Sequence, residues 1–139
     1  MVSHDAADIL SWADTIVILK AGECIQQGAP EQVYRQPVNE YSAGLFGEYN
    51  LLNAVDASLL VPTVSISNQK KLLVRPEQFI VTGAGGLQGI VANISFMGSY
   101  YIIDVIAGSQ TLKIKTGDNT FAAGQTVQLS LSSGTPWYI

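Results

Sequence analysis

The sequence is poor in the residues that most often carry chemistry. Its 139 residues include one cysteine, Cys24, and one histidine, His4. A single cysteine excludes a disulfide framework within the chain and fits a reducing compartment. One histidine and one cysteine cannot complete a zinc site, and on its own His4 is read more readily as a structural residue than as a catalytic one.

Charge and long apolar runs are also scarce. Charged residues make up 13% of the chain, and 7 Lys and Arg against 11 Asp and Glu give a net charge of -4. Such a chain lacks the basic surface that attracts nucleic acid or anionic membrane. No apolar run reaches the roughly 18 residues of a membrane span, and the first five residues are unlike a signal peptide. We therefore expect a small cytoplasmic protein that neither binds nucleic acid nor inserts into a membrane.

Apolar residues, in contrast, are abundant. They make up 47% of the chain, which is enough for a packed core and excludes a disordered protein. Their pattern changes near residue 50, from helical signals around one hairpin to a series of short strands. The sequence thus predicts two domains, with bounds 1–50 and 51–139.

The helical signals of the first fifty residues lie at cap positions. Asp5 is expected to cap a helix that starts at the next residue. Pro30 suits the first position of a second helix, although Ala29 before it cannot cap with its side chain. Asn39 is expected to cap a third helix, and Gly47 to end it.

A hairpin is expected between the first two helices. The continuous apolar run 15–19 predicts a strand that is buried on both faces. Because alanine resists a positive φ, we expect a type I turn in which only Gly22 is left-handed, rather than a type I′ turn that includes Ala21. Cys24 then lies in the second strand, where a buried, inert thiol is the expected state.

From residue 51 onward, apolar residues alternate with period two. Strands separated by glycine-rich turns are expected at 51–55, 58–61, 63–66, 72–75, 79–81, 88–96, 101–107, 111–115 and 126–131. In the strand 88–96, the face formed by Ile90, Ala92, Ile94 and Phe96 is expected to be the apolar one. Short strands at this spacing predict a small barrel or sandwich.

Three further groups of residues have ordinary structural explanations. Helix capping and solvation account for the carboxylates Asp5, Asp8 and Asp14. The glycine-rich segment 83–86 leads into a strand and lacks the Lys-Ser/Thr of a phosphate loop, so we interpret it as a turn. The aromatic residues around position 100 could stack on bases, but packing is the better account because few cations lie nearby; they are Phe96, Tyr100 and Tyr101.

Taken in order, the segments resemble a known family. The first part of the chain resembles the end of the nucleotide-binding domain of ABC transporter ATPases. The features that carry this resemblance are a histidine after a shortened strand, a helix, an apolar strand, a turn at Gly22 and a helix that begins with proline. Later segments narrow the resemblance to importer ATPases of the spermidine/putrescine and ferric-iron type, which carry a C-terminal transport-associated OB (TOBE) domain. The segments are 2–5, 12–14, 16–19, 27–34, 46–54, 73–77, 89–98 and 124–129.

This resemblance implies a mainly β fold. A small OB-like, TOBE-like β-barrel over 51–139 would follow an α/β remnant of the nucleotide-binding domain, made of short helices and a β-hairpin over 1–50. It also implies a role for His4, as the switch histidine that hydrogen-bonds the γ-phosphate and the attacking water in the complete ATPase.

The family's other ATPase motifs are absent from the sequence. It has no Gly-x-x-x-x-Gly-Lys-Ser/Thr loop, no Leu-Ser-Gly-Gly-Gln signature and no apolar strand that ends in Asp-Glu. We therefore expect this chain alone to be inactive and to hold no cofactor, whereas the complete parent protein would use ATP and magnesium.

The resemblance implies partners as well. These would be membrane permease subunits and a second ATPase subunit in a homodimer, which would place the protein at the inner face of the cell membrane. Two alternatives stay open: a free-standing OB-like module that binds a ligand or nucleic acid, and a non-native dimer formed through an exposed strand at 15–19.

Overall fold

The computed structural model describes residues 5–61 and 69–139. They form two compact units, Met1–Glu48 together with Ile139 (unit 1) and Tyr49–Tyr138 (unit 2), which are described separately. None of the helices in this described part of the chain has the length and apolar character that crossing a bilayer requires. The strand expected at 63–66 lies outside the described residues.

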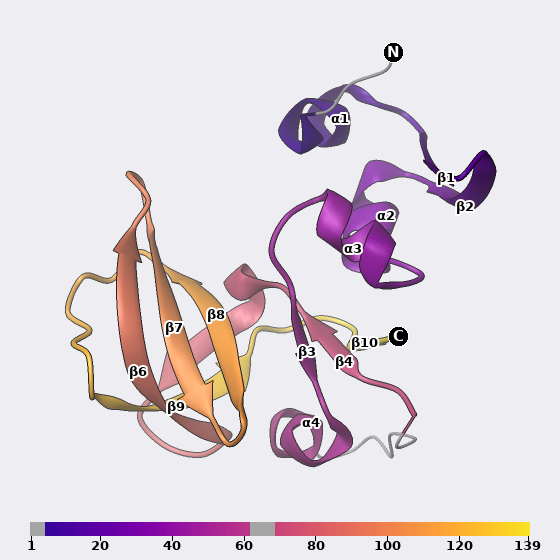
Figure 1. The fold of residues 1–139 in the computed structure, drawn as a ribbon. Coiled ribbons are helices and arrows are strands. Elements are labelled where there is room, and N and C mark those ends of the chain that lie inside the picture. Colours follow the sequence, from indigo (N-terminus) through magenta and orange to yellow (C-terminus); the bar gives the residue numbers. More distant parts are fainter. Residues whose placement is uncertain (1–4, 62–68) are drawn as a thin grey trace. The chain divides into compact units, whose positions relative to one another are not determined.

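Unit 1 contains three short helices, and the cap residues define where they begin. The Asp5 carboxylate accepts the N–H groups of Ala7 and Asp8 at the start of α1 (Ala6–Trp12). Pro30 opens α2 (Pro30–Arg35), which has no side-chain cap, and Asn39 caps α3 (Glu40–Leu45). The structure confirms these predictions (Figure 1).

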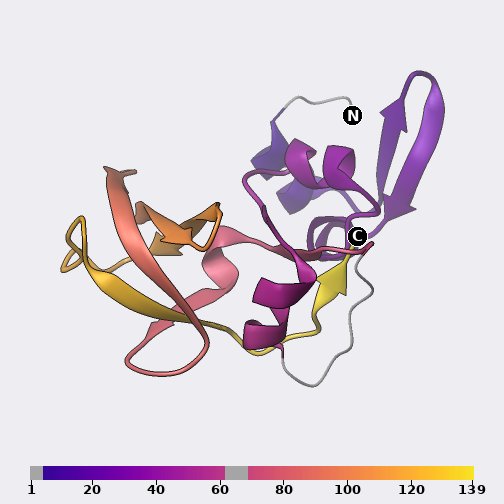
Figure 2. The same ribbon diagram turned by 60° about the horizontal axis from the view of Figure 1, so that its bottom comes forward.

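The strands β1 (Ile16–Lys20) and β2 (Glu23–Gly28) form the predicted antiparallel hairpin (Figure 2). The predicted turn type is wrong. Ala21 has a φ of 50° and Gly22 a φ of 80°, as in a type I′ turn. The twist of this turn matches that of the paired strands, which favours it despite the cost at alanine.

The predicted burial of β1 on both faces is also wrong for unit 1. Ile16 and Ile18 pack with Val33 and Phe46 in the small core of this unit. Val17 is half exposed and Leu19 slightly more than half, because no other described element of unit 1 buries their face.

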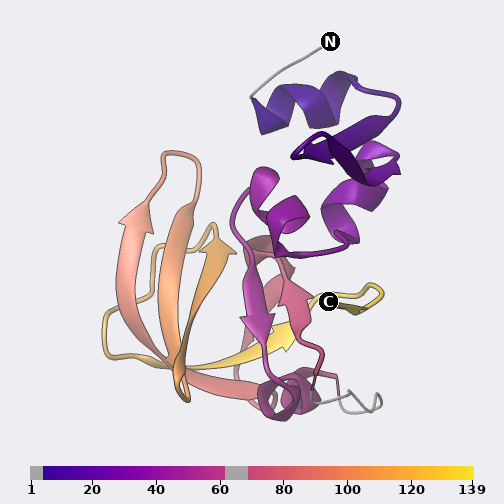
Figure 3. The same cartoon turned by 45° about the vertical axis from the view of Figure 1, so that its right-hand side comes forward.

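Unit 2 is built from two antiparallel sheets. Figures 1 and 3 show β6, β7 and β8 side by side in the larger one. The three-stranded sheet has the order β10-β4-β3 and the five-stranded sheet the order β5-β9-β6-β7-β8. The strands are β3 (Asn50–Leu52), β4 (Leu72–Val74), β5 (Phe79–Thr82), β6 (Leu87–Phe96), β7 (Tyr101–Ala107), β8 (Gln110–Thr116), β9 (Thr126–Leu131) and β10 (Trp137–Tyr138). The fold is mainly β, as predicted, although these sheets do not close into one continuous barrel.

The strands expected at 51–55 and 58–61 are largely replaced by a helix. β3 ends at Leu52, and the Asn53 side chain accepts the N–H of Asp56 to cap α4 (Ala54–Leu60). Ala57 is buried and Leu60 packs against the core, whereas Val55 is exposed. The spacing of three between the two inward residues suits a helix, so the alternation along 51–61 was misleading.

The expected apolar face of β6 is wrong over its first half. Leu87, Gly89 and Val91 face the core, and Ile90 is half exposed. A β-bulge between Val91 and Asn93 then shifts the register, which brings Ile94 against the core. Since side chains alternate between faces, one extra residue reverses the face along the rest of the strand.

The core of unit 2 draws on both sheets. Its buried members include Leu52 and Leu72 from the smaller sheet and Ile103, Ile114 and Leu129 from the larger one. The period-two alternation expected at 101–107, 111–115 and 126–131 is confirmed, because the apolar residues of one face of each strand point into the core. This shared core holds the sheets together where no backbone ladder joins them.

Candidate functional site

His4, the predicted catalytic residue, lies outside the described residues, so its role stays a prediction. The described chain begins at Asp5, whose carboxylate is used in capping α1. Asp8 lies in the first turn of that helix, where a negative charge is favourable. No group of three or more His, Cys, Asp or Glu that could hold a metal occurs among the described residues.

Cys24 is exposed, which contradicts the predicted buried thiol. It lies opposite Leu19 in the hairpin, on the face that no other described element of unit 1 buries. Its thiol lies 3.8 Å from the carbonyl oxygen of Gln26. The apolar neighbours in the sequence gave no sign that this face stays open.

The glycine segment 83–86 is a turn between β5 and β6, as predicted. Gly85 and Gly86 both have positive φ values, and a Cβ at Gly86 would collide with the carbonyl oxygen of Leu129. Glycine is therefore needed here for the close approach of two strands, and a phosphate loop is not formed.

Two of the three aromatic residues predicted to pack contact one another near the β6–β7 turn, and the third contacts a lysine. The ring centroids of Phe96 and Tyr101 are 5.4 Å apart. The Lys115 ammonium lies 4.3 Å from the centre of the Tyr100 ring. Phe96 is nevertheless 68% exposed, so this cluster is a surface feature rather than part of the core.

Within the segment 73–77 of the family resemblance, Arg75-Pro76-Glu77 forms a motif in which Arg75 is the N-cap and Pro76 and Glu77 begin the short 3-10 helix η1 (Pro76–Gln78). The Arg75 backbone N–H donates to Oε1 of Gln78 over 2.6 Å, and the Gln78 N–H donates back to the Arg75 carbonyl over 3.0 Å. Arg75 is buried. The motif thus builds a rigid turn between the smaller sheet and the larger one.

Asn50 is a buried residue that the sequence gave no reason to single out as a contact between sheets. Its side-chain amide donates to the carbonyl oxygens of Val74 and Lys113 and accepts the Lys113 N–H over 2.8 Å. The Gln110 side chain also donates to the Leu51 carbonyl. Side-chain amides thereby bridge β3 and β8, where a closed barrel would have a backbone ladder. An asparagine just before an apolar strand was the only signal available.

Two described groups have shifted pKa values, and neither belongs to a catalytic arrangement. Hydrogen bonds from the side chain and backbone of Thr120 hold the pKa of Asp118 below its usual value. Burial raises the pKa of the Tyr138 phenol.

Comparison with known families resolves what this architecture is. The TOBE domain family matches residues 72–137, from β4 through the five-stranded sheet to β10. Residues 72–137 form a TOBE domain. The resemblance predicted for the second half of the chain is thereby confirmed.

Known relatives extend the similarity beyond the TOBE domain. The chain is 31% identical over 134 residues to the spermidine/putrescine import ATP-binding protein PotA of Onion yellows phytoplasma, which covers 85% of this chain and 32% of that protein. It is 28% identical to the Fe(3+) ions import ATP-binding protein FbpC of Photobacterium profundum, over 88% of this chain and 39% of that protein. The FbpC 2 protein of Rhodococcus jostii is 28% identical over 92% of this chain and 38% of its own length.

The chain spans about a third of the length of these relatives. Because 85–92% of it aligns, the similarity includes residues of unit 1 as well as the TOBE domain. The predicted resemblance to ATP-binding proteins of ABC importers is thus confirmed.

Proposed function

We propose that the chain is the regulatory and dimer-supporting C-terminal segment of the ATP-hydrolysing subunit of an ABC importer. The observation that supports this proposal most is the TOBE match over 72–137 within an alignment that covers most of the chain. The relatives are named as import ATP-binding proteins, which suits permease subunits and a second ATPase subunit as partners. The protein would then lie in the cytoplasm, at the inner face of the membrane.

In the complete ATPase, His4 is the switch histidine. A neutral imidazole can donate a hydrogen bond to a phosphate oxygen, which would help to position the γ-phosphate and attacking water. The phosphate-binding loop, the signature and the carboxylates that hold magnesium are missing from the sequence. The chain by itself therefore binds no ATP tightly and hydrolyses none.

A chimera tests this role directly. The preceding two thirds of the phytoplasma PotA protein would be joined to this chain, and ATP binding and hydrolysis would be measured with His4 and with His4→Ala. We expect the substitution to lower hydrolysis by about 10²-fold or more, with little loss of ATP binding. Ser11→Ala, an exposed change on α1, is the matched control and should leave both unchanged. Full hydrolysis by the His4→Ala chimera would contradict the assignment.

The alternative function is a free-standing OB-like binding module. The aromatic cluster of Phe96, Tyr100 and Tyr101 beside Lys115 is the observation that favours it. Gel-shift assays with single-stranded oligonucleotides over a range of salt concentrations distinguish the two functions. We expect no shift with the 139-residue chain, and a salt-sensitive shift would favour the alternative.

A further inference from the structure

One pocket of unit 2 has no part in the proposed function. Its volume is about 190 Å³, and it lies, partly open to solvent, between the end of α4, strand β4 and the chain that leads from β9 to β10. An apolar cavity of about 150 Å³ is large enough to take benzene. This pocket therefore has room for an organic molecule of roughly six to eight non-hydrogen atoms.

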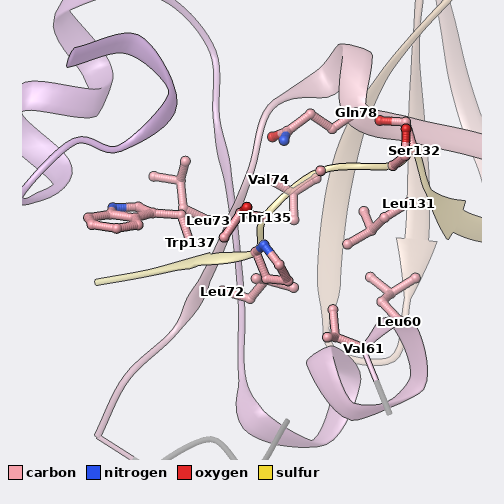
Figure 4. Close-up of a pocket in the computed structure, with 13 residues that line it drawn as sticks. Leu60, Val61, Leu72, Leu73, Val74, Gln78, Leu131, Ser132, Thr135 and Trp137 are labelled. Carbon is pink, nitrogen blue, oxygen red and sulfur yellow. The ribbon is translucent and has the colours of Figure 1, made fainter. Parts of the chain in front are cut away.

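The two ends of the pocket differ in polarity. Leu60 and Val61 line one end and Gln78 and Ser132 the other, with Leu131 between them (Figure 4). The Ser132 N–H donates to the Gln78 carbonyl over 2.8 Å, which fixes the two polar residues beside each other. Oε1 of Gln78 is occupied by the Arg75 N–H, so the side chain has its NH₂ group to offer as a donor.

The described lining also lacks charge. None of its residues is Asp, Glu, Lys, Arg or His. A charged ligand would lose hydration there without gaining a counter-charge, which disfavours both anions and cations. Polyamines and ferric ions, the solutes in the names of the relatives, are cations and do not suit this site.

We propose that this pocket is a binding site for a small uncharged molecule with an apolar body and one hydroxyl or carbonyl group. The apolar body lies against Leu60, Val61 and Leu131. Its oxygen accepts hydrogen bonds from the Gln78 amide and the Ser132 hydroxyl.

The test uses probes of one size and different charge. Methyl NMR spectra of the 139-residue chain are recorded during titration with benzyl alcohol, benzoate, benzylamine and toluene. Benzyl alcohol is expected to give saturable shifts at the methyl groups of Leu60, Val61 and Leu131, and none at the core residue Leu112. The two charged probes should bind about tenfold or more weakly, since their charge is not compensated.

Variants identify the contacts. Leu60→Phe fills the pocket and should weaken the binding of benzyl alcohol about tenfold or more. Leu59→Phe, on the exposed side of the same helix, should leave this binding unchanged. Ser132→Ala should weaken the binding of benzyl alcohol several-fold and leave the binding of toluene unchanged. This second variant keeps the test valid if the backbone spectrum shows that Leu60→Phe disturbs the fold.

Three results would overturn the proposal. The first is the absence of saturable shifts with benzyl alcohol. The second is binding of the charged probes as tight as that of benzyl alcohol. The third is an equal loss of affinity for toluene and benzyl alcohol in Ser132→Ala. None of these measurements involves ATP or His4, so the proposal fails or stands independently of the ATPase function.

Discussion

Residues 1–48 and residues 49–139 differ sharply in charge. The first part contains seven Asp and Glu against two Lys and Arg, and the second contains four against five. The acidity of the whole chain is therefore a property of its first part. The expectation that the chain does not bind nucleic acid rested on the net charge of -4, which does not describe the TOBE part. That expectation therefore depends on the gel-shift assay.

The two units differ as much in their cores. Among the described residues, fourteen buried hydrophobic residues form one cluster in unit 2, whereas the cluster of unit 1 has four. Unit 1 also leaves Val17 and Leu19 exposed on β1. Since burial of apolar surface is the main stabilising contribution, we expect unit 2 to be the more stable of the two and unit 1 to open first.

The largest effect is expected from truncation of the unit 2 core. Ile103 is completely buried in β7, so Ile103→Ala should lower the free energy of unfolding by about 2–5 kcal/mol. Ile106→Ala, at a half-exposed position of the same strand, is the control and should change it by about 0.5 kcal/mol or less. Urea unfolding measures the difference, and amide hydrogen exchange shows where it acts. Equal acceleration of exchange in both units by Ile103→Ala would mean that they unfold together.

The side-chain bridge between β3 and β8 should have the next largest effect. Asn50→Leu removes three hydrogen bonds and leaves the buried carbonyl of Val74 and the partly buried backbone groups of Lys113 without this partner. We expect a loss of about 2–4 kcal/mol in the stability of unit 2.

Asn93→Leu, at an exposed position of β6, serves as the control for this change. Thermal unfolding followed by circular dichroism compares the two variants. A stability of Asn50→Leu equal to that of Asn93→Leu would show that the core alone holds the sheets together.

Substitutions at helix caps change the stability of unit 1 and test whether unit 2 responds. Asn39→Ala removes the side-chain bond to the Ser42 N–H and should destabilise α3 by about 1 kcal/mol. Ala29→Ser introduces a cap that α2 lacks and should stabilise unit 1 by a similar amount.

The hydrogen-exchange rates of unit 1 amides measure the effect of both substitutions on stability, and the rates of unit 2 amides provide the internal control. A change of similar size in unit 2 would show that the units are coupled.

The smallest effect concerns a carboxylate of unit 2. The pKa of Asp118 is lowered by hydrogen bonds from Thr120, so Thr120→Val should raise it toward the usual value. Because the folded pKa lies below the unfolded one, the stabilisation is present above the unfolded pKa and is lost as pH falls through the folded value.

Carbon NMR titration of the Asp118 carboxyl measures this shift. Thr126→Val, an exposed change in β9, is the control. An unchanged Asp118 pKa in Thr120→Val would rule out the side-chain hydrogen bond as the cause.

The sequence predicted those features that depend on neighbours along the chain. Asp5, Pro30 and Asn39 mark helix starts because a cap acts on backbone groups two or three residues away. The alternation in 101–107 and 126–131 identified inward faces because nothing interrupts the period of those strands. The order of segments in the chain also predicted the TOBE resemblance.

Tertiary structure decided the features that depend on contacts between distant segments. Whether 54–60 became a strand or a helix depended on how Ala57 and Leu60 meet the core, and the exposed face of β6 depended on a bulge. Asn50 is buried because its amide meets β8, 63 residues away along the chain. Likewise, Cys24 is exposed because no other described element of unit 1 covers its face of the hairpin, which neighbouring residues do not reveal.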